Sequence, residues 1–157
     1  MNEFILMAHV LFGVACIVAT VWVFVDVLNA EESNLQRIKW ISWAAAVLMW
    51  LSFLIGGYWY VVFYPADKAI ILKGPWPFAH TLFMETKEHL FFITLILALY
   101  LPIAASEKLY ASAVARKMVL CVAMLIVLSG LAIEGSGAVI NHGAKVAILH
   151  ASAGSGR

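Results

Sequence analysis

Four long runs of apolar residues constrain the fold of this chain more than any other feature. A bilayer core about 30 Å thick needs about 20 residues of helix to cross it. Runs of that order occupy residues 4–28, 38–63, 81–105 and 118–140. Only helices and closed barrels satisfy the backbone inside lipid, and the alternating pattern of a barrel is absent. The sequence therefore predicts an all-α membrane protein, a four-transmembrane-helix up-down bundle.

The composition agrees with a surface that faces lipid. Hydrophobic residues make up 64% of the 157 positions and charged residues 12%, whereas a typical soluble domain is about one quarter charged. The net charge of +1 provides no basic surface for nucleic acid. We expect the lipid bilayer as the main partner, one domain over residues 1–150, and a flexible tail over the small and polar residues 151–157.

Four spans place both termini on one side of the membrane. Basic residues divide evenly between the two faces, but the short connection between the third and fourth spans, with Lys108, Arg116 and Lys117, is the densest basic patch. Cytoplasmic loops carry an excess of Lys and Arg. We therefore expect a bacterial inner-membrane protein with both termini in the periplasm.

The histidines, apart from His150 beside the tail, gather on the face that carries the termini. His9 lies early in the first span, His80 and His89 lie at the start of the third, and His142 follows the end of the fourth. Ionisable side chains within membrane spans are candidates for function. His9 and His89 are the stronger candidates because both lie within a helix, whereas His80 and His142 also fit a headgroup layer.

Small residues follow His9 at helical spacing. Gly13, Cys16 and Thr20 lie at +4, +7 and +11 from the histidine and therefore share one helix face. Such a stripe allows two helices to approach closely, and it also leaves room for a flat, bulky group. The sequence leaves both interpretations open.

Three acidic residues lie near or within the spans. Glu85 lies one helical turn before His89, and Glu88 immediately precedes His89. A carboxylate in this position can orient a histidine that binds a metal. Glu134 lies inside the fourth run, where a lone carboxylate either binds a proton or pairs with a cation. We predict a proton-transfer or supporting role for these three residues.

Imidazoles from different helices are typical ligands of haem iron, and a four-helix bundle can hold the macrocycle between its helices. No CxxCH sequence is present, so such a haem is haem b, held without covalent attachment. His9 and His89 are the favoured pair of ligands, and His80 and His142 form a second pair or exchange with the first. The predicted cofactor-binding residues are His9, His89, His80, His142, Gly13 and Lys87.

The segments MAHVLFGV, around His9, and KEHLFF, around His89, occur in a short chain with four spans. In this outline the chain resembles the small membrane b-type cytochromes and is similar to the HemJ-like and CopD-like families. The likeness covers the number of spans and these histidines. It implies electron transfer between haem and a quinol or partner cytochrome, or a haem-dependent oxidation. If the protein is an enzyme, it is then an oxidoreductase or a subunit of one.

Two other functions remain open from the sequence. The four histidines, with Glu85 and Glu88, supply nitrogen and oxygen ligands suited to a non-haem metal ion. Alternatively, Glu134 and the histidines serve proton movement or docking in a transport or assembly subunit that has no cofactor. In each case we expect a homo-oligomer or a subunit of a larger complex.

Overall fold

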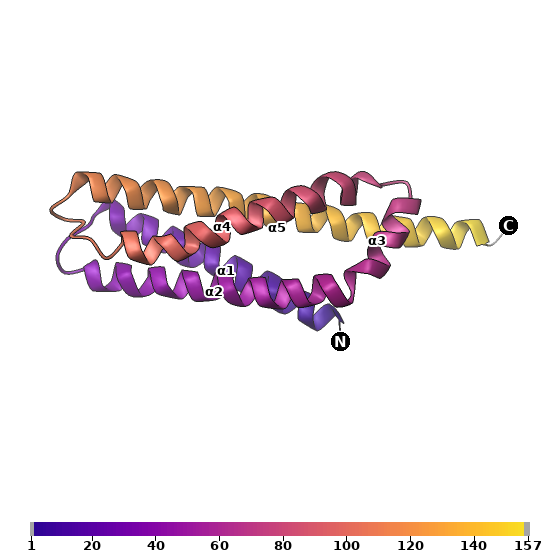
Figure 1. Ribbon diagram of the computed structural model, residues 1–157, viewed down its shortest axis with the longest axis horizontal. Helices are drawn as coiled ribbons and strands as arrows, with labels where there is room; N and C mark the ends of the chain where they lie inside the picture. Colours follow the sequence, from indigo (N-terminus) through magenta and orange to yellow (C-terminus); the bar gives the residue numbers. More distant parts are fainter. Residues whose placement is uncertain (1, 156–157) are drawn as a thin grey trace.

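A computed structural model describes residues 2–155, and all regular elements in this range are helices. They are α1 (Asn2–Leu28), α2 (Leu35–Val62), α3 (Tyr64–Lys73), the π-helix η1 (Ala79–Met84), α4 (Glu85–Ala104) and α5 (Ala113–Ser155) (Figure 1). Within the described range, four helical stretches are long and apolar enough to cross a membrane: α1, α2, η1 together with α4, and α5. The prediction of an all-helical chain with four candidate spans is confirmed.

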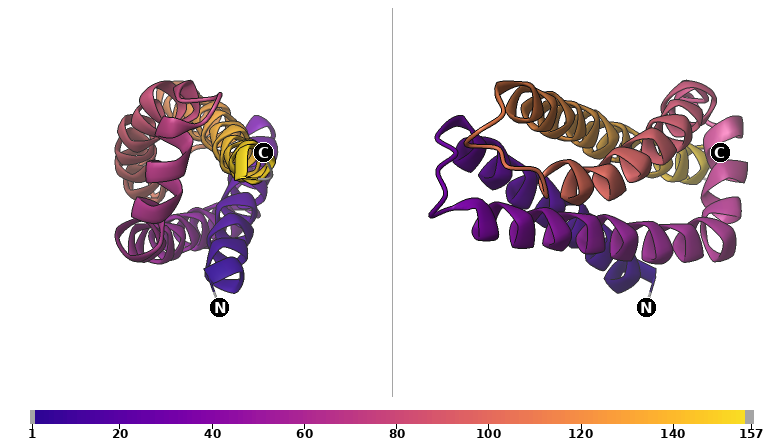
Figure 2. Two further views of the ribbon diagram at one scale, coloured as in Figure 1. Left: turned by 90° about the vertical axis from the view of Figure 1, so that its right-hand side faces the viewer. Right: turned by 60° about the vertical axis from the view of Figure 1, so that its left-hand side comes forward.

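The four long helices lie alongside one another (Figure 1). The connections 29–34 and 105–112 lie together at one end, which we call the loop end. At the other end, which we call the terminal end, α3 lies across the ends of the long helices (Figure 2). Both termini point toward the terminal end, and α5 projects beyond the rest of the molecule (Figure 1).

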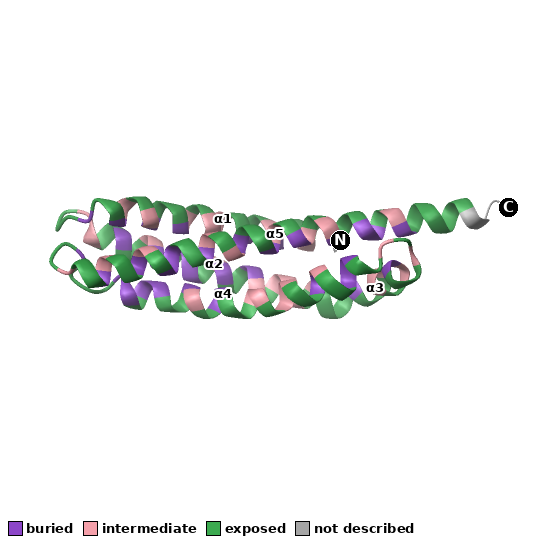
Figure 3. Ribbon diagram, turned by 90° about the horizontal axis from the view of Figure 1, so that it is seen from above, coloured by how far each residue is buried: buried purple, intermediate pink, exposed green. Residues whose placement is uncertain are grey.

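Apolar packing divides into two clusters of buried side chains (Figure 3). The larger cluster fills the half of the bundle nearest the loop end, with Val23, Ile38, Leu101 and Ile126 among its fully buried members. The smaller cluster, at the terminal end, centres on Tyr64, Ile71, Ala79, Met84, Ile140 and Ala144. The level between the two clusters is where the polar side chains of the spans meet.

The last helix is longer than predicted. The sequence indicated a span that ends near residue 140 and a flexible tail over 151–157, but α5 continues without a break to Ser155, and residues 156–157 lie outside the described range. The extension packs on its neighbours, because a Cβ added at Gly143 would lie 2.6 Å from Ala79 Cβ and one added at Gly74 would lie 2.7 Å from Ala147 Cβ. His142 therefore lies inside a helix and not after its end.

The connection 64–80 is largely helical, although its tryptophan, tyrosine and prolines predict a loop at the membrane interface. It begins with α3, which has a proline in its first turn, where the missing backbone N–H costs nothing. It ends with the first residues of η1, whose wider turns carry His80 into the bundle. The local sequence did not reveal this ordering because α3 owes its position to packing against α5 and η1.

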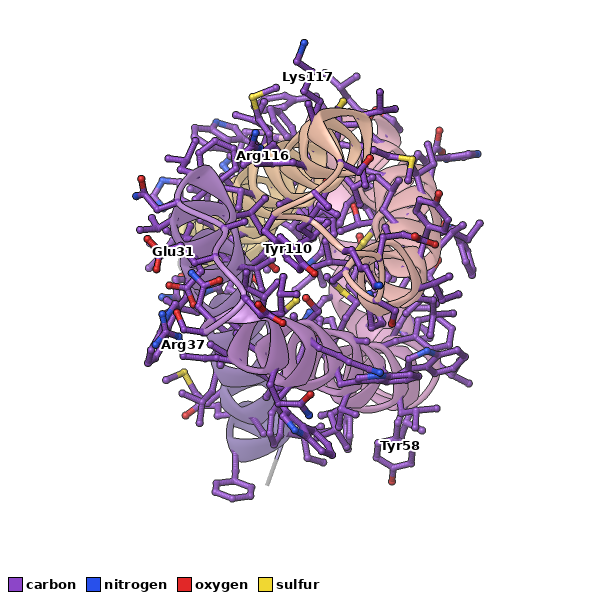
Figure 4. The ribbon with its side chains drawn as sticks, turned by 90° about the vertical axis from the view of Figure 1, so that its left-hand side faces the viewer. Glu31, Arg37, Tyr58, Tyr110, Arg116 and Lys117 are labelled. Atoms are coloured by element: carbon purple, nitrogen blue, oxygen red, sulfur yellow. The ribbon has the colours of Figure 1, made fainter. Side chains whose placement is uncertain are left out.

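The loop end is held by an ion pair between the first two helices. Arg37 donates to both carboxylate oxygens of Asp26, with Nε–Oδ2 and Nη2–Oδ1 distances of 2.7 and 2.9 Å. Figure 4 shows this end with Arg37, Arg116 and Lys117 around its rim. The loop end is thus a charged face that carries both basic residues and acidic ones such as Glu31.

Replacement of Leu101, which is fully buried in the larger cluster, tests this packing. Leu101→Ala leaves a cavity, and we expect it to lower the free energy of unfolding by about 2–5 kcal/mol. Ile103→Ala is the matched control, because Ile103 lies on the same helix and is 63% exposed. Thermal unfolding in detergent measures both. Equal loss of stability in the two variants would contradict the packing described.

Candidate functional site

Each of the four long helical stretches contributes one polar side chain to the level between the two apolar clusters. These side chains are His9 of α1, Ser52 of α2, Lys87 of α4 and Glu134 of α5. His9 and Ser52 are buried, with exposed fractions of 6% and 1%. Lys87 and Glu134 are half-buried. We call this group the polar layer.

Hydrogen bonds to Ser52 fix the ring of His9. Nδ1 of His9 lies 2.9 Å from the carbonyl oxygen of Ser52 and 2.9 Å from its hydroxyl oxygen. The Ser52 hydroxyl in turn donates to the carbonyl oxygen of His9, at 3.1 Å. A carbonyl oxygen only accepts, so Nδ1 carries a proton, and in the neutral ring Nε2 then retains its lone pair. The helix α2 thus selects the tautomer in which Nε2 is the basic atom.

Two adjacent glycines show how closely α2 approaches this ring. A Cβ added at Gly56 would lie 2.5 Å from Nδ1 of His9 and 2.7 Å from Cε1. A Cβ added at Gly57, on the next position of the helix, would meet nothing within 4 Å. The absence of a side chain at Gly56 is therefore what admits the imidazole.

Glycines make room for the two charged side chains in the same way. A Cβ at Gly13 would collide with Oε1 of Glu134, and Ser52 Oγ lies 3.5 Å from the same point. A Cβ at Gly137 would lie 3.2 Å from Nζ of Lys87. The stripe of small residues predicted after His9 therefore accommodates a carboxylate from α5. At Gly13 the small residue both lets α1 and α5 pack closely and makes room for the Glu134 carboxylate.

Two cavities adjoin the polar layer and share His9 and Lys87. The first, the aromatic lobe, has a volume of about 300 Å³ and lies between α2 and α4. Its ring-bearing lining residues, besides His9, are Phe53, Trp59, Tyr60, Phe91 and Phe92. The second, the polar lobe, has a volume of about 260 Å³ and includes Asp67, Glu134 and Asn141 in its lining.

Glu88 projects into the aromatic lobe and not away from the bundle. Its Oε1 is the buried side-chain oxygen that lacks a hydrogen-bond partner among the described residues. Tyr60, on the facing helix, interacts with the same carboxylate. The lobe therefore combines aromatic walls with a carboxylate oxygen that can accept a hydrogen bond.

The helix α3 closes the terminal end with a second polar contact. The hydroxyl of Tyr64, which is 1% exposed, lies 2.9 Å from Nδ1 of His80. Burial, together with the nearby Tyr60, Glu88 and Asp67, raises the pKa of Tyr64 well above its ordinary value. Burial also raises the pKa of Asp67. His80 is thus held by α3 and does not line either lobe.

The structure separates the two histidines that were the favoured ligand pair. His9 faces the interior, whereas His89 is exposed on the outer side of α4, where Nδ1 donates to the carbonyl oxygen of Glu85 at 2.7 Å. Glu85 is likewise exposed. His142 is exposed on α5, with its ring 5.0 Å from the ring of Trp76. The structure therefore does not bring the favoured pair, His9 and His89, together within one bundle, and their role as ligands stays a prediction.

Of the predicted site residues, the structure brings five to the polar layer and its lobes: His9, Gly13, Lys87, Glu88 and Glu134. Helical spacing did not reveal which side of α4 faces inward, because its first five residues, Glu85 to His89, include no apolar side chain. Among residues 2–155, no group of three or more His, Cys, Asp and Glu side chains is arranged to hold a metal ion. The mixed ligand set of the non-haem interpretation is therefore dispersed over different faces.

Several residues of the site were not singled out from the sequence. Ser52 belongs to a stripe of small residues in α2, where its hydroxyl gave no sign of a partner. Asp67 and Tyr64 lie in the segment predicted as a loop. Ser52 could have been noticed from the sequence, because polar residues are rare within apolar runs.

No family model, curated protein or solved structure matches the chain. The resemblance to small membrane b-type cytochromes remains a prediction.

The neighbouring glycines of α2 provide a matched test of the site. Gly56→Ala forces His9 away from Ser52, and we expect it to lower the free energy of unfolding by about 1–3 kcal/mol, since buried polar groups lose their partners. The methyl group of Gly57→Ala meets open space. We therefore expect the free energy of unfolding to stay the same or to rise by up to about 1 kcal/mol, because alanine has the higher helix propensity. Thermal unfolding of the two variants compares them. Equal effects would contradict the contact between Gly56 and His9.

Proposed function

We propose that this chain is an integral membrane protein that binds haem b at His9 and transfers electrons between the haem and a quinol or a partner cytochrome. The observation that carries the proposal is the state of His9 at the edge of the aromatic lobe. Histidines that bind metals usually donate their other ring N–H to a carbonyl or carboxylate, which fixes the ring and makes the free nitrogen more basic. His9 has this arrangement with Ser52.

The residues around His9 fit a flat, apolar cofactor. Aromatic side chains from α2 and α4 line the aromatic lobe and provide apolar surfaces for such a group. Lys87 reaches the same cavity with a positive charge suited to a propionate. The absence of side chains at Gly56 and Gly57 leaves the lobe open beside the imidazole. When bound, haem supplies reversible one-electron transfer, with a potential that the axial ligand and burial adjust.

The bundle offers one histidine to this site. Of the four histidines predicted as ligands, His9 alone lines the lobes, while His80 is held by Tyr64 and the other two are exposed. We therefore propose His9 as the histidine ligand of the haem within one bundle. His89 is not part of this proposed ligand set.

The orientation and assembly are proposed on separate grounds. The basic residues of the loop end, among them Arg116 and Lys117 (Figure 4), support a cytoplasmic loop end. We propose periplasmic termini accordingly, for a four-span up-down bundle in a bacterial inner membrane. His89 and Glu85 are exposed on the outer side of α4 within a candidate span. Polar side chains rarely face lipid. Their position supports association with a second membrane chain, whether a copy of this one or another subunit.

A visible spectrum of the protein purified from cells with ample haem tests the proposal. We expect a haem spectrum that changes on reduction with dithionite. His9→Ala removes the iron ligand and is expected to abolish this spectrum. His89→Ala and His150→Ala are expected to retain it, since both residues lie outside the cavity.

Two results would overturn the proposal. The first is wild-type protein that contains no haem. The second is a His9→Ala variant that folds and keeps the wild-type spectrum. Loss of haem in His89→Ala would show that the ligand set is wrong as proposed.

A further inference from the structure

The polar lobe holds two carboxyl groups that the proposed haem site does not use, those of Glu134 and Asp67. Glu134, Lys87 and Asp67 line it from three different helices, α5, α4 and α3. A cavity of about 260 Å³ that also has His9 and Asn141 in its lining is large enough for several water molecules, which need polar partners. The aromatic lobe, by contrast, has six rings in its lining.

Glu134 is held in place without an ion-pair partner in direct contact. Its carboxylate lies against Gly13, and Lys87 Nζ lies over Gly137, one helical turn along α5 from Glu134. The two charges interact electrostatically, yet the one ion pair within 4.0 Å among the described residues is Arg37–Asp26. The carboxylate therefore has a cation nearby and room to exchange a proton with water.

The polar lobe is accessible from one end of the bundle. Asp67 lies on α3, beyond the candidate span Leu35–Val62, and therefore at the surface of the terminal end. Toward the loop end the interior is closed, because Cys16, Thr20 and Ile126 are fully buried in a packed region. The lobe therefore connects Glu134 with the terminal end.

We propose that Glu134 is a proton-binding site that exchanges with water at the terminal end through the polar lobe. The carboxylate takes a proton from water in the lobe to become a carboxylic acid, and returns it to water on release. The titratable and charged groups that line the lobe with it are His9 from α1, Asp67 from α3 and Lys87 from α4. The hydroxyl of Ser52, on α2, lies near its carboxylate beside Gly13, and Asn141 of its own helix also lines the lobe. This site requires no haem and goes beyond the proposed function.

Infrared spectroscopy of the full-length protein in lipid nanodiscs, titrated over pH, tests the site. We expect a carboxylic acid C=O band that appears as the pH falls and is lost in Glu134→Gln. Glu85→Gln is the matched control, because Glu85 is an exposed carboxylate outside the lobes, and its replacement leaves the band in place. A band unchanged in Glu134→Gln would overturn the proposal.

Transfer of the same samples to D₂O tests the route. The Glu134 band is expected to shift within the mixing time, because water reaches the carboxyl group. Ala138→Trp fills the polar lobe and is expected to slow this shift, whereas Ala132→Trp, also exposed on α5 but outside the lobe, does not. A band that does not exchange in the wild type, or equal rates in the two tryptophan variants, would contradict access through the lobe.

Gly13→Ala provides a second variant if Glu134→Gln does not fold. The added methyl group displaces the Glu134 carboxylate, and we expect the frequency of its band to change. An unchanged band in Gly13→Ala would show that the band belongs to another carboxyl group. None of these measurements depends on bound haem, so failure of this proposal is distinct from failure of the haem proposal.

Discussion

The contact between a glycine of one helix and a polar side chain of another is the interaction on which the centre of this bundle depends. In an apolar medium an unpaired polar group is costly, so His9, Lys87 and Glu134 must lie inward and find partners. Each of them lies against a glycine of a neighbouring helix, at Gly56, Gly137 and Gly13. Larger residues at these three positions would separate the helices at the level of the polar layer.

The position of the polar layer between two apolar clusters explains why cavities adjoin it. Side chains of the larger cluster fill the loop end, and Tyr64 and Ile71 anchor the packing of the terminal end. Between them, glycines remove volume while the charged side chains hold the helices at a fixed separation. The result is an aromatic lobe on one side of His9 and a polar lobe on the other, which suits a division between electron transfer and proton binding.

The apolar runs predicted much of the fold, but they did not predict every residue of the site. Length and hydropathy decide whether a helix can span a membrane, so four candidate spans were predictable. The inward face of α4 was not predictable. Lys87 and His89 are two positions apart and so point to different sides of the helix, and their neighbours give no clear apolar face. The structure directs Lys87 inward and His89 outward.

The extent of the last helix depends on contacts that a sequence does not display. Judged from the local sequence alone, Gly143 resembles a residue that ends a helix. In the fold it allows α5 to pack against η1, and the helix continues. The same argument applies to Tyr64, whose hydrogen bond to His80 joins residues from two elements that only the fold brings together.

Solid-state NMR of ¹⁵N-histidine-labelled protein in lipid bilayers tests the central claim most directly. The account predicts that His9, in protein without haem, has a protonated Nδ1 and an unprotonated Nε2, and that Ser52→Ala disturbs both signals. Addition of haem is predicted to shift the Nε2 signal of His9 and to leave that of His89 unchanged. A His9 ring protonated at Nε2, or a haem-dependent change confined to His89, would contradict it.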